Sequence, residues 1–227
     1  ATSYTTCMGS DWPGNGGALG LGDMSEEDGS IPGTSIGQPG HPQNTHEDGY
    51  DIDIAYYQVN TSDNKLRSVC DHVSGGADQY HCVSEPYLLD VWRTALALGA
   101  MLTSDRVRVI GLDGKVGALV EEAMEVLCNG GYLPQTSCNN MYKLAYEVTD
   151  QGLGWYHFHH HHFHLSLNGI PGSSSNSVLA TTCLTPDCSP AVHDLGVLDH
   201  AHTPGHGLVL NPKAGFDKVR VLHLPLD

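Results

Sequence analysis

Residues 50–57 read Tyr-Asp-Ile-Asp-Ile-Ala-Tyr-Tyr, and the regular structure of the chain is expected to begin with this stretch. Acidic and branched apolar side chains alternate strictly along it, which is the period of a β-strand. One face carries Asp51 and Asp53, and the opposite face carries Ile52 and Ile54. The two carboxylates either line a solvated face or, if that face is buried, need a cation or a hydrogen-bond donor to compensate their charge.

The periodicity after this strand predicts an α+β fold. An apolar helix is expected over residues 86–103, a strand over residues 106–112, and then a second helix with Asp113 as its N-cap. The aromatic and histidine-rich residues 155–167 predict a third strand, and residues 216–224 predict a fourth. This order of elements predicts a small, mainly antiparallel sheet with helices on one side.

Glycine and proline indicate a loop-rich chain. Of its 227 residues, 27 are glycine and 12 are proline. The length fits one domain rather than two. Residues 1–45 have neither a helical nor a strand period, so we expect them to form a Gly/Pro-rich N-terminal arm. The domain itself is expected over residues 46–227.

The charge balance excludes some partners. The chain has 26 Asp and Glu residues against 10 Lys and Arg residues, a formal net charge of −16. Such a surface is poorly suited to nucleic acid or anionic lipid. No stretch reaches the roughly 18 apolar residues that a membrane-spanning helix needs, so no membrane insertion is expected. The 15 histidines raise the question of metal binding.

Seven cysteines form three close pairs and leave one residue over: Cys70 with Cys82, Cys128 with Cys138, Cys183 with Cys188, and Cys7. This pattern predicts a disulfide-stapled fold in an oxidising compartment, either the periplasm or the cell exterior. The sequence begins Ala1-Thr2-Ser3 without a methionine, which we interpret as a processed chain whose export signal has been removed.

The best chemical candidate is His46 with Asp53, seven residues apart across a turn into the first predicted strand, and the run of histidines in residues 155–167 is the second. On a strand, a period of two places His160, His162 and His164 on one face. Buried imidazoles need partners for both ring nitrogens, so a row of them favours metal binding or catalysis over a role in packing.

Other motifs carry weaker signals. Residues 33–37 match GxSxG, but they lack the preceding strand and following helix of a nucleophile elbow. The acidic residues 23–28 lack the order of an EF-hand. His200 and His202 are expected on a turn rather than on a rigid strand. The types and number of four further residues fit a zinc site, although they lack a CxxC knuckle. These residues are Cys70, His72, His81 and Cys82.

The spacing of His46 and Asp53, followed far along the chain by His162-Phe163-His164, resembles a group of zinc peptidases. The group comprises relatives of D-Ala-D-Ala carboxypeptidases, lysostaphin-type enzymes and the hedgehog signalling domain. Within it, residues 40–54 are similar to the first metal motif of penicillin-insensitive murein endopeptidases. Residues 155–167 resemble the aromatic-His-x-His strand of that family.

This resemblance implies Zn²⁺ bound by His46, Asp53 and His164, with a fourth position open to water. It also implies that His162 acts as a general base or stabilises the oxyanion, and that His159 contacts the substrate or the transition state. The implied substrate is a D-amino-acid-containing cross-link peptide of bacterial peptidoglycan. Two alternatives remain open, a zinc-containing binding protein without catalysis and a zinc endopeptidase that acts on ordinary proteins.

Overall fold

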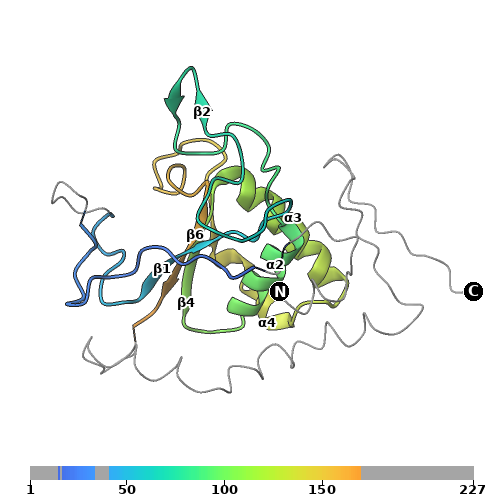
Figure 1. Ribbon diagram of the computed structural model, residues 1–227. Helices are drawn as coiled ribbons and strands as arrows, with labels where there is room; N and C mark the ends of the chain where they lie inside the picture. Colours follow the sequence, from blue (N-terminus) through green and yellow to red (C-terminus); the bar gives the residue numbers. More distant parts are fainter. Residues whose placement is uncertain (1–14, 16, 34–40, 170–227) are drawn as a thin grey trace, which may run out of the picture.

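The computed structural model describes residues 15, 17–33 and 41–169, and Figure 1 shows their arrangement. A four-stranded sheet has the strand order β1-β6-β4-β5. Strand β6 is antiparallel to both β1 and β4, whereas β5 is parallel to β4. The strands are β1 (Asp51–Ala55), β4 (Val107–Gly111), β5 (Leu144–Ala145) and β6 (His162–Leu167). The predicted small, mainly antiparallel sheet is confirmed.

The helices gather on one side of this sheet, as Figure 1 shows for α2, α3 and α4. They are α2 (Val91–Met101), α3 (Gly114–Asn129) and α4 (Gln135–Asn139), followed by the 3₁₀ turn η2 (Met141–Lys143). The predicted α+β class is therefore confirmed. None of the helices in the described residues is long and apolar enough to cross a membrane.

The N-caps decide where the two long helices begin. The Asp113 carboxylate accepts a hydrogen bond from the backbone N–H of Lys115 at 2.9 Å, which confirms the predicted cap of α3. The start expected at residue 86 for the other helix is wrong. Asp90 caps α2 by accepting from the backbone N–H of Arg93 at 3.1 Å, so the helix begins at Val91.

The third predicted strand is shorter than residues 155–167, because β6 begins only at His162. Backbone groups before that residue are held by other partners. The N–H of Trp155 donates to the Glu147 carboxylate at 2.7 Å, and Phe158 has a left-handed φ of 73°. A strand cannot pass through such a residue, so His160 does not share the strand face of His162. The strand predicted at residues 216–224 lies outside the described residues.

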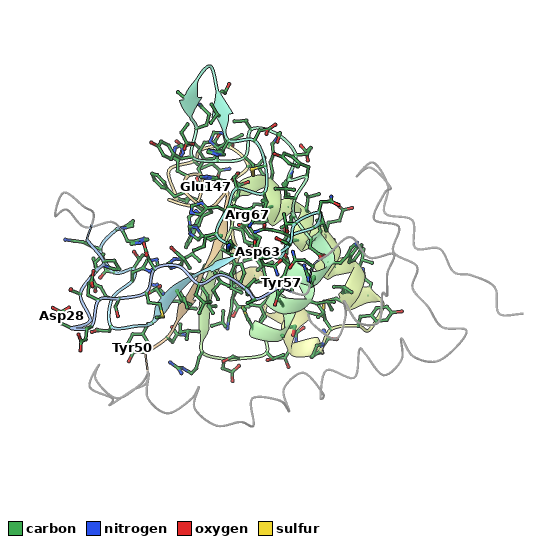
Figure 2. All side chains as sticks on the ribbon, viewed as in Figure 1. Asp28, Tyr50, Tyr57, Asp63, Arg67 and Glu147 are labelled. Atoms are coloured by element: carbon green, nitrogen blue, oxygen red, sulfur yellow. A yellow bond between two sulfur atoms is a disulfide. The ribbon has the colours of Figure 1, made fainter. Side chains whose placement is uncertain are left out.

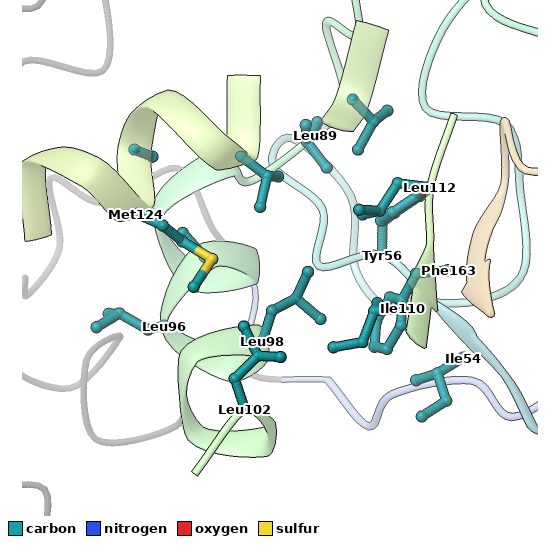
Figure 3. Close-up of a cluster of buried hydrophobic side chains, with 14 of the residues drawn as sticks. Ile54, Tyr56, Leu89, Leu96, Leu98, Leu102, Ile110, Leu112, Met124 and Phe163 are labelled. Carbon is teal, nitrogen blue, oxygen red and sulfur yellow. The ribbon is translucent and has the colours of Figure 1, made fainter. Parts of the chain in front are cut away.

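The core lies between the sheet and the helices, as Figure 3 shows. Ile54 of β1 pairs across the strands with Phe163 of β6, and both are buried. Leu98 of α2, its C-cap residue Leu102 and Met124 of α3 are also buried and belong to the same apolar cluster. Because side chains alternate along a strand, burying Ile54 and Phe163 on this side turns their neighbours to the opposite face.

Part of the predicted N-terminal arm lies along the outer edge of β1. Leu21 forms an antiparallel bridge with Ile54, and Leu19 forms a parallel bridge with Asn64. The N–H of Gly22 donates to the Asp53 carbonyl at 2.7 Å. A Cβ atom at Gly22 would lie 3.0 Å from the Cβ of Asp53, so this segment passes directly beside that residue.

Two of the predicted disulfides are present, Cys70–Cys82 and Cys128–Cys138. The third predicted pair, Cys183 with Cys188, and the single Cys7 lie outside the described residues. The first bridge closes a loop that carries the hairpin β2 (Val73–Ser74) and β3 (Ala77–Asp78). Because Cys70 and Cys82 are bonded to each other, the alternative zinc site that used both thiolates is wrong.

Candidate functional site

The register of β1 against β6 brings the predicted site residues together. Asp53 pairs with His164, and Ala55 pairs with His162, so these side chains share the sheet face opposite the helices. This face is covered rather than solvated. Asp51 is 4% exposed and Asp53 is 5% exposed, so the interpretation of these carboxylates as a solvated face is wrong. Such buried charge needs compensation.

Three imidazoles surround one carboxylate oxygen and supply this compensation. Oδ1 of Asp53 lies 3.1 Å from Nδ1 of His164, 3.3 Å from Nε2 of His162 and 3.4 Å from Nε2 of His46. Nε2 of His46 lies 3.0 Å from Nδ1 of His164. We call these four residues the Asp53 cluster. It joins residues that the sequence separates by up to 118 positions.

The spacing of these atoms fits a metal ion. In a tetrahedral site with metal–ligand bonds of roughly 2.0–2.1 Å, neighbouring ligand atoms are about 3.3–3.4 Å apart. The ligand atoms of His46, Asp53 and His164 are separated by 3.0, 3.1 and 3.4 Å. The donor set of two imidazoles and one carboxylate is also typical of metal centres. The chain therefore carries a group of side chains that can hold a metal.

A histidine that the sequence analysis left out of the site also lies here. His41 stacks on His46 with ring centroids 3.7 Å apart, and its Nε2 lies 3.0 Å from Oδ2 of Asp23. One ligand atom each of His41, His46 and Asp53 lies within 4.8 Å of the other two. The signal for His41 in the sequence was its position five residues before His46. His41 is thus a further metal-binding candidate.

The backbone at His46 is held in an uncommon conformation. His46 has a φ of 52°, in the left-handed region, and so do Asn44 at 67° and Asp48 at 55°. Non-glycine residues adopt this region rarely, and such outliers gather at functional sites because surrounding contacts must stabilise them. His46 is fully buried. The loop is thus shaped to bring this one imidazole to the sheet.

A second carboxylate orients His164 from behind. Nε2 of His164 lies 3.0 Å from Oδ1 of Asp51, on the opposite side of the ring from the nitrogen that faces Asp53. Arg108 reaches the same Asp51 oxygen at 3.4 Å and donates to the Ser166 hydroxyl. Metal-binding histidines commonly donate their second N–H to a carboxylate in this way. The alternation of residues 50–57 predicts the face on which Asp51 lies, but it does not predict that Asp51 orients His164.

We expect Asp51→Asn to weaken metal affinity by on the order of 10–100-fold, the usual scale for losing a partner that orients a metal ligand. The amide retains the shape of the side chain but removes the charge that fixes the His164 ring. Competition with a chromophoric chelator measures the affinity. Asp105→Asn is the control, because Asp105 is an exposed carboxylate away from the cluster. Equal affinities in the two variants would contradict the role given to Asp51.

The charges in the cluster perturb its titration. Burial opposes ionisation of Asp53, but hydrogen bonds from His162, His164 and His46 outweigh it and hold the pKa of Asp53 well below its usual range. Burial lowers the pKa of His164, but the hydrogen bonds to Asp51 and Asp53 outweigh that effect and the pKa is raised. The cluster thus pairs an ionised carboxylate with imidazoles, the arrangement in which a cation is favoured.

His159 lies beside the cluster but outside the strand. Its ring centroid is 5.4 Å from that of His162 and 5.5 Å from that of Trp155. Its carbonyl accepts a hydrogen bond from the hydroxyl of buried Tyr56 at 2.9 Å. Burial, followed by the neighbouring His162 and His164, lowers the pKa of His159 to about 3. His159 is therefore a neutral imidazole at ordinary pH.

Glu147 holds the loop that carries His159 (Figure 2). The carboxylate is 2% exposed and accepts four backbone N–H groups, at 2.7–3.1 Å. The donors are Gln151, Leu153, Trp155 and Tyr156. Glu147 is the only buried glutamate in the part of the chain that the structure describes. Its lone pairs are occupied by these donors, so it organises the loop and is not a free acid or base.

We expect Glu147→Gln to destabilise the protein, because the amide NH₂ would face backbone N–H donors. Burial opposes ionisation of Glu147, but the four backbone hydrogen bonds outweigh it and lower the pKa below the reference value of 4.5. A lowered pKa stabilises the fold above the reference value, and this contribution disappears as the pH falls through the folded-state pKa. The Tm difference between wild type and variant should therefore shrink between about pH 7 and about pH 3.

The control for this comparison is Glu122→Gln, since Glu122 is exposed on α3. Its Tm should follow that of the wild type across the whole pH range. A Tm difference for Glu147→Gln that stayed constant with pH would show that the charge of Glu147 is not what holds the loop.

A pocket of about 250 Å³ lies elsewhere, at the start of α3. His81, Lys115 and Tyr156 are among its lining residues, and none of the Asp53 cluster is. The pocket is therefore a feature separate from the cluster, and the assignment of the site rests on side-chain geometry rather than on a cavity.

Several sequence candidates do not join the Asp53 cluster. His160 and His72 stack on each other with ring centroids 4.6 Å apart, at the hairpin β2–β3. His200 and His202 lie outside the described residues, as does most of the GxSxG motif at residues 33–37. Searches with models of protein families, among curated proteins and among solved structures found no match to this chain.

Proposed function

We propose that the protein is a zinc metallopeptidase, an endopeptidase that hydrolyses the D-amino-acid-containing cross-link peptides of peptidoglycan. The observation that carries this proposal is the set of three ligand atoms from His46, Asp53 and His164, mutually 3.0–3.4 Å apart. Catalytic zinc takes three protein ligands and leaves one position open, whereas structural zinc takes four. The substrate class rests on the resemblance of residues 40–54 and 155–167 to murein endopeptidases.

The residues around the ligand set suit peptide hydrolysis. Zinc held there would polarise the scissile carbonyl and lower the pKa of a bound water to about 7. His162 lies next to His164 on β6, and its Nε2 is 3.3 Å from Oδ1 of Asp53. We assign His162 the role of general base or oxyanion donor. Neutral His159, in contact with His162, would donate an N–H to an oxygen of the substrate or transition state.

The location that we propose is the periplasm or the cell exterior, where peptidoglycan is found. Two disulfides, Cys70–Cys82 and Cys128–Cys138, are typical of proteins that fold in an oxidising compartment. An acidic chain with a net charge of −16 is also poorly suited to nucleic acid as an alternative partner.

The test is to incubate the zinc-loaded protein with purified, cross-linked murein and to identify the muropeptides by mass spectrometry. We expect cross-linked dimers to be converted to monomers, in a reaction that a chelator stops and added Zn²⁺ restores. Casein is incubated in parallel as an ordinary protein substrate. Cleavage of casein alone would identify an endopeptidase for ordinary proteins. Bound zinc without cleavage of either substrate would identify a binding protein.

A further inference from the structure

A second group of potential ligands lies at the hairpin β2–β3, outside the Asp53 cluster. His72 directly precedes β2, and Asp78 ends β3, where it pairs with Val73. Nδ1 of His72 lies 3.0 Å from Oδ1 of Asp78. One ligand atom each of His72, Asp78 and His160 lies within 4.8 Å of the other two. We call these three residues the His160 cluster.

The hairpin that presents two of these residues is rigidly built. Gly75 and Gly76 form its turn with φ values of 61° and 81°, the left-handed pair that a two-residue hairpin turn requires. The Cys70–Cys82 disulfide closes the loop at its base. The N–H of Gln79 donates to the His72 carbonyl at 2.8 Å, which extends the ladder beyond β2. The relative position of His72 and Asp78 is therefore determined by the backbone.

His160 provides an independent sign of a missing partner. It is 7% exposed, and its Nδ1 is buried without a hydrogen-bond partner in the described structure. The His160 ring also has a hydrogen bond to the backbone at Tyr80, which orients it. A buried polar atom without a partner is costly, and an imidazole held by one nitrogen offers the other as a ligand.

We propose that His72, Asp78 and His160 form a second metal site, which binds a divalent first-row transition metal such as Zn²⁺. Two imidazoles and one carboxylate match the ligand preferences of these ions, whereas Ca²⁺ and Mg²⁺ prefer oxygen ligands. The bound metal fastens the hairpin β2–β3 to the segment that leads into β6.

This site is distinct from the Asp53 cluster but adjoins it. The ring of His161 lies between them, with its centroid 4.7 Å from that of His160 and 4.5 Å from that of His162. Nε2 of His161 lies 3.2 Å from Nδ1 of His162. A metal bound by His160 would therefore restrict the motion of the neighbouring His161, which contacts His162.

The experiment titrates Co²⁺ into the metal-stripped full chain and follows its visible absorption and binding heat. We expect two ions per chain. His72→Gln and Asp78→Asn should each weaken one of the two by on the order of 10²-fold or more, above the 10–100-fold scale of a partner that only orients a ligand. Both residues lie at the surface of the hairpin, so the variants should fold. Asp71→Asn, an exposed carboxylate of the same disulfide loop, should leave both ions bound.

Asp53→Asn separates the two sites, since it should abolish binding at the Asp53 cluster and leave one ion at the His160 cluster. This outcome would hold even if the protein were not a peptidase. One ion per chain in the wild type, lost in Asp53→Asn, would overturn the second site. Two ions retained at full affinity in both His72→Gln and Asp78→Asn would overturn it as well.

Discussion

Asp53→Asn and His164→Ala should each lose the metal of the Asp53 cluster and the peptidase activity together. Asp53 is the centre of the cluster, because its Oδ1 lies within 3.4 Å of three imidazole nitrogens. His164 contacts both Asp53 and His46 through one ring nitrogen. Loss of several kcal/mol of metal-derived transition-state stabilisation corresponds to a decrease in kcat/KM on the order of 10³-fold or more.

Elemental analysis after dialysis measures the metal, and muropeptide release measures the activity. Asp105→Asn and His157→Ala are the matched controls, since both residues lie away from the cluster. Circular dichroism verifies that each variant folds. A metal content in both ligand variants equal to that of the wild type would place the metal elsewhere, and His200 with His202 would then be the next candidates.

His162→Ala should behave differently and lose activity while it retains the metal. The side chains of His162 and His164 share one face of β6, so both reach the ligand set. If His162 is the base or the oxyanion donor, metal content stays near normal. The activity then falls on the order of 10²-fold or more, the scale for removing such a group.

Measuring both quantities on this one variant distinguishes three roles. A metal ligand would lose metal and activity together, and a residue without a role would lose neither. Measuring the peptidase activity of the variant at increasing zinc concentrations separates weak metal binding from slow chemistry. Activity that returns at high zinc identifies His162 as a metal ligand. Unchanged cleavage by His162→Ala would refute the mechanism even if the metal site is correct.

Local sequence was sufficient to predict β1 and the face on which Asp53 lies. Residues 50–57 alternate between acidic and apolar side chains, and a strand turns successive side chains to opposite faces. Burial of Ile54 and Phe163 against the helices therefore leaves Asp53 and His164 together on the other face. The Asp113 cap and the disulfide pairs Cys70–Cys82 and Cys128–Cys138 were likewise readable because the partners are close in sequence.

Contacts between segments that are distant in the sequence could not be predicted from local patterns. The start of β6 depends on Glu147, whose carboxylate accepts hydrogen bonds from the backbone N–H groups of Trp155 and Tyr156. The predicted strand over residues 155–167 had the correct alternation, but hydrogen bonds to another segment removed its first half. His160 therefore left the expected row of histidines and stacks on His72.

The faces of β1, the Asp113 cap of α3 and the residue types of a metal site could be predicted from the sequence, because these depend on periods and partners within a few residues. The tertiary structure was needed to see that the acidic face of β1 is covered rather than solvated. It was also needed to see that His41 stacks on His46, that Asp51 contacts the far nitrogen of His164, and that the histidines divide between two clusters. The physical reason is that burial and long-range hydrogen bonds, which set the cost of each charge, arise only when remote segments pack together.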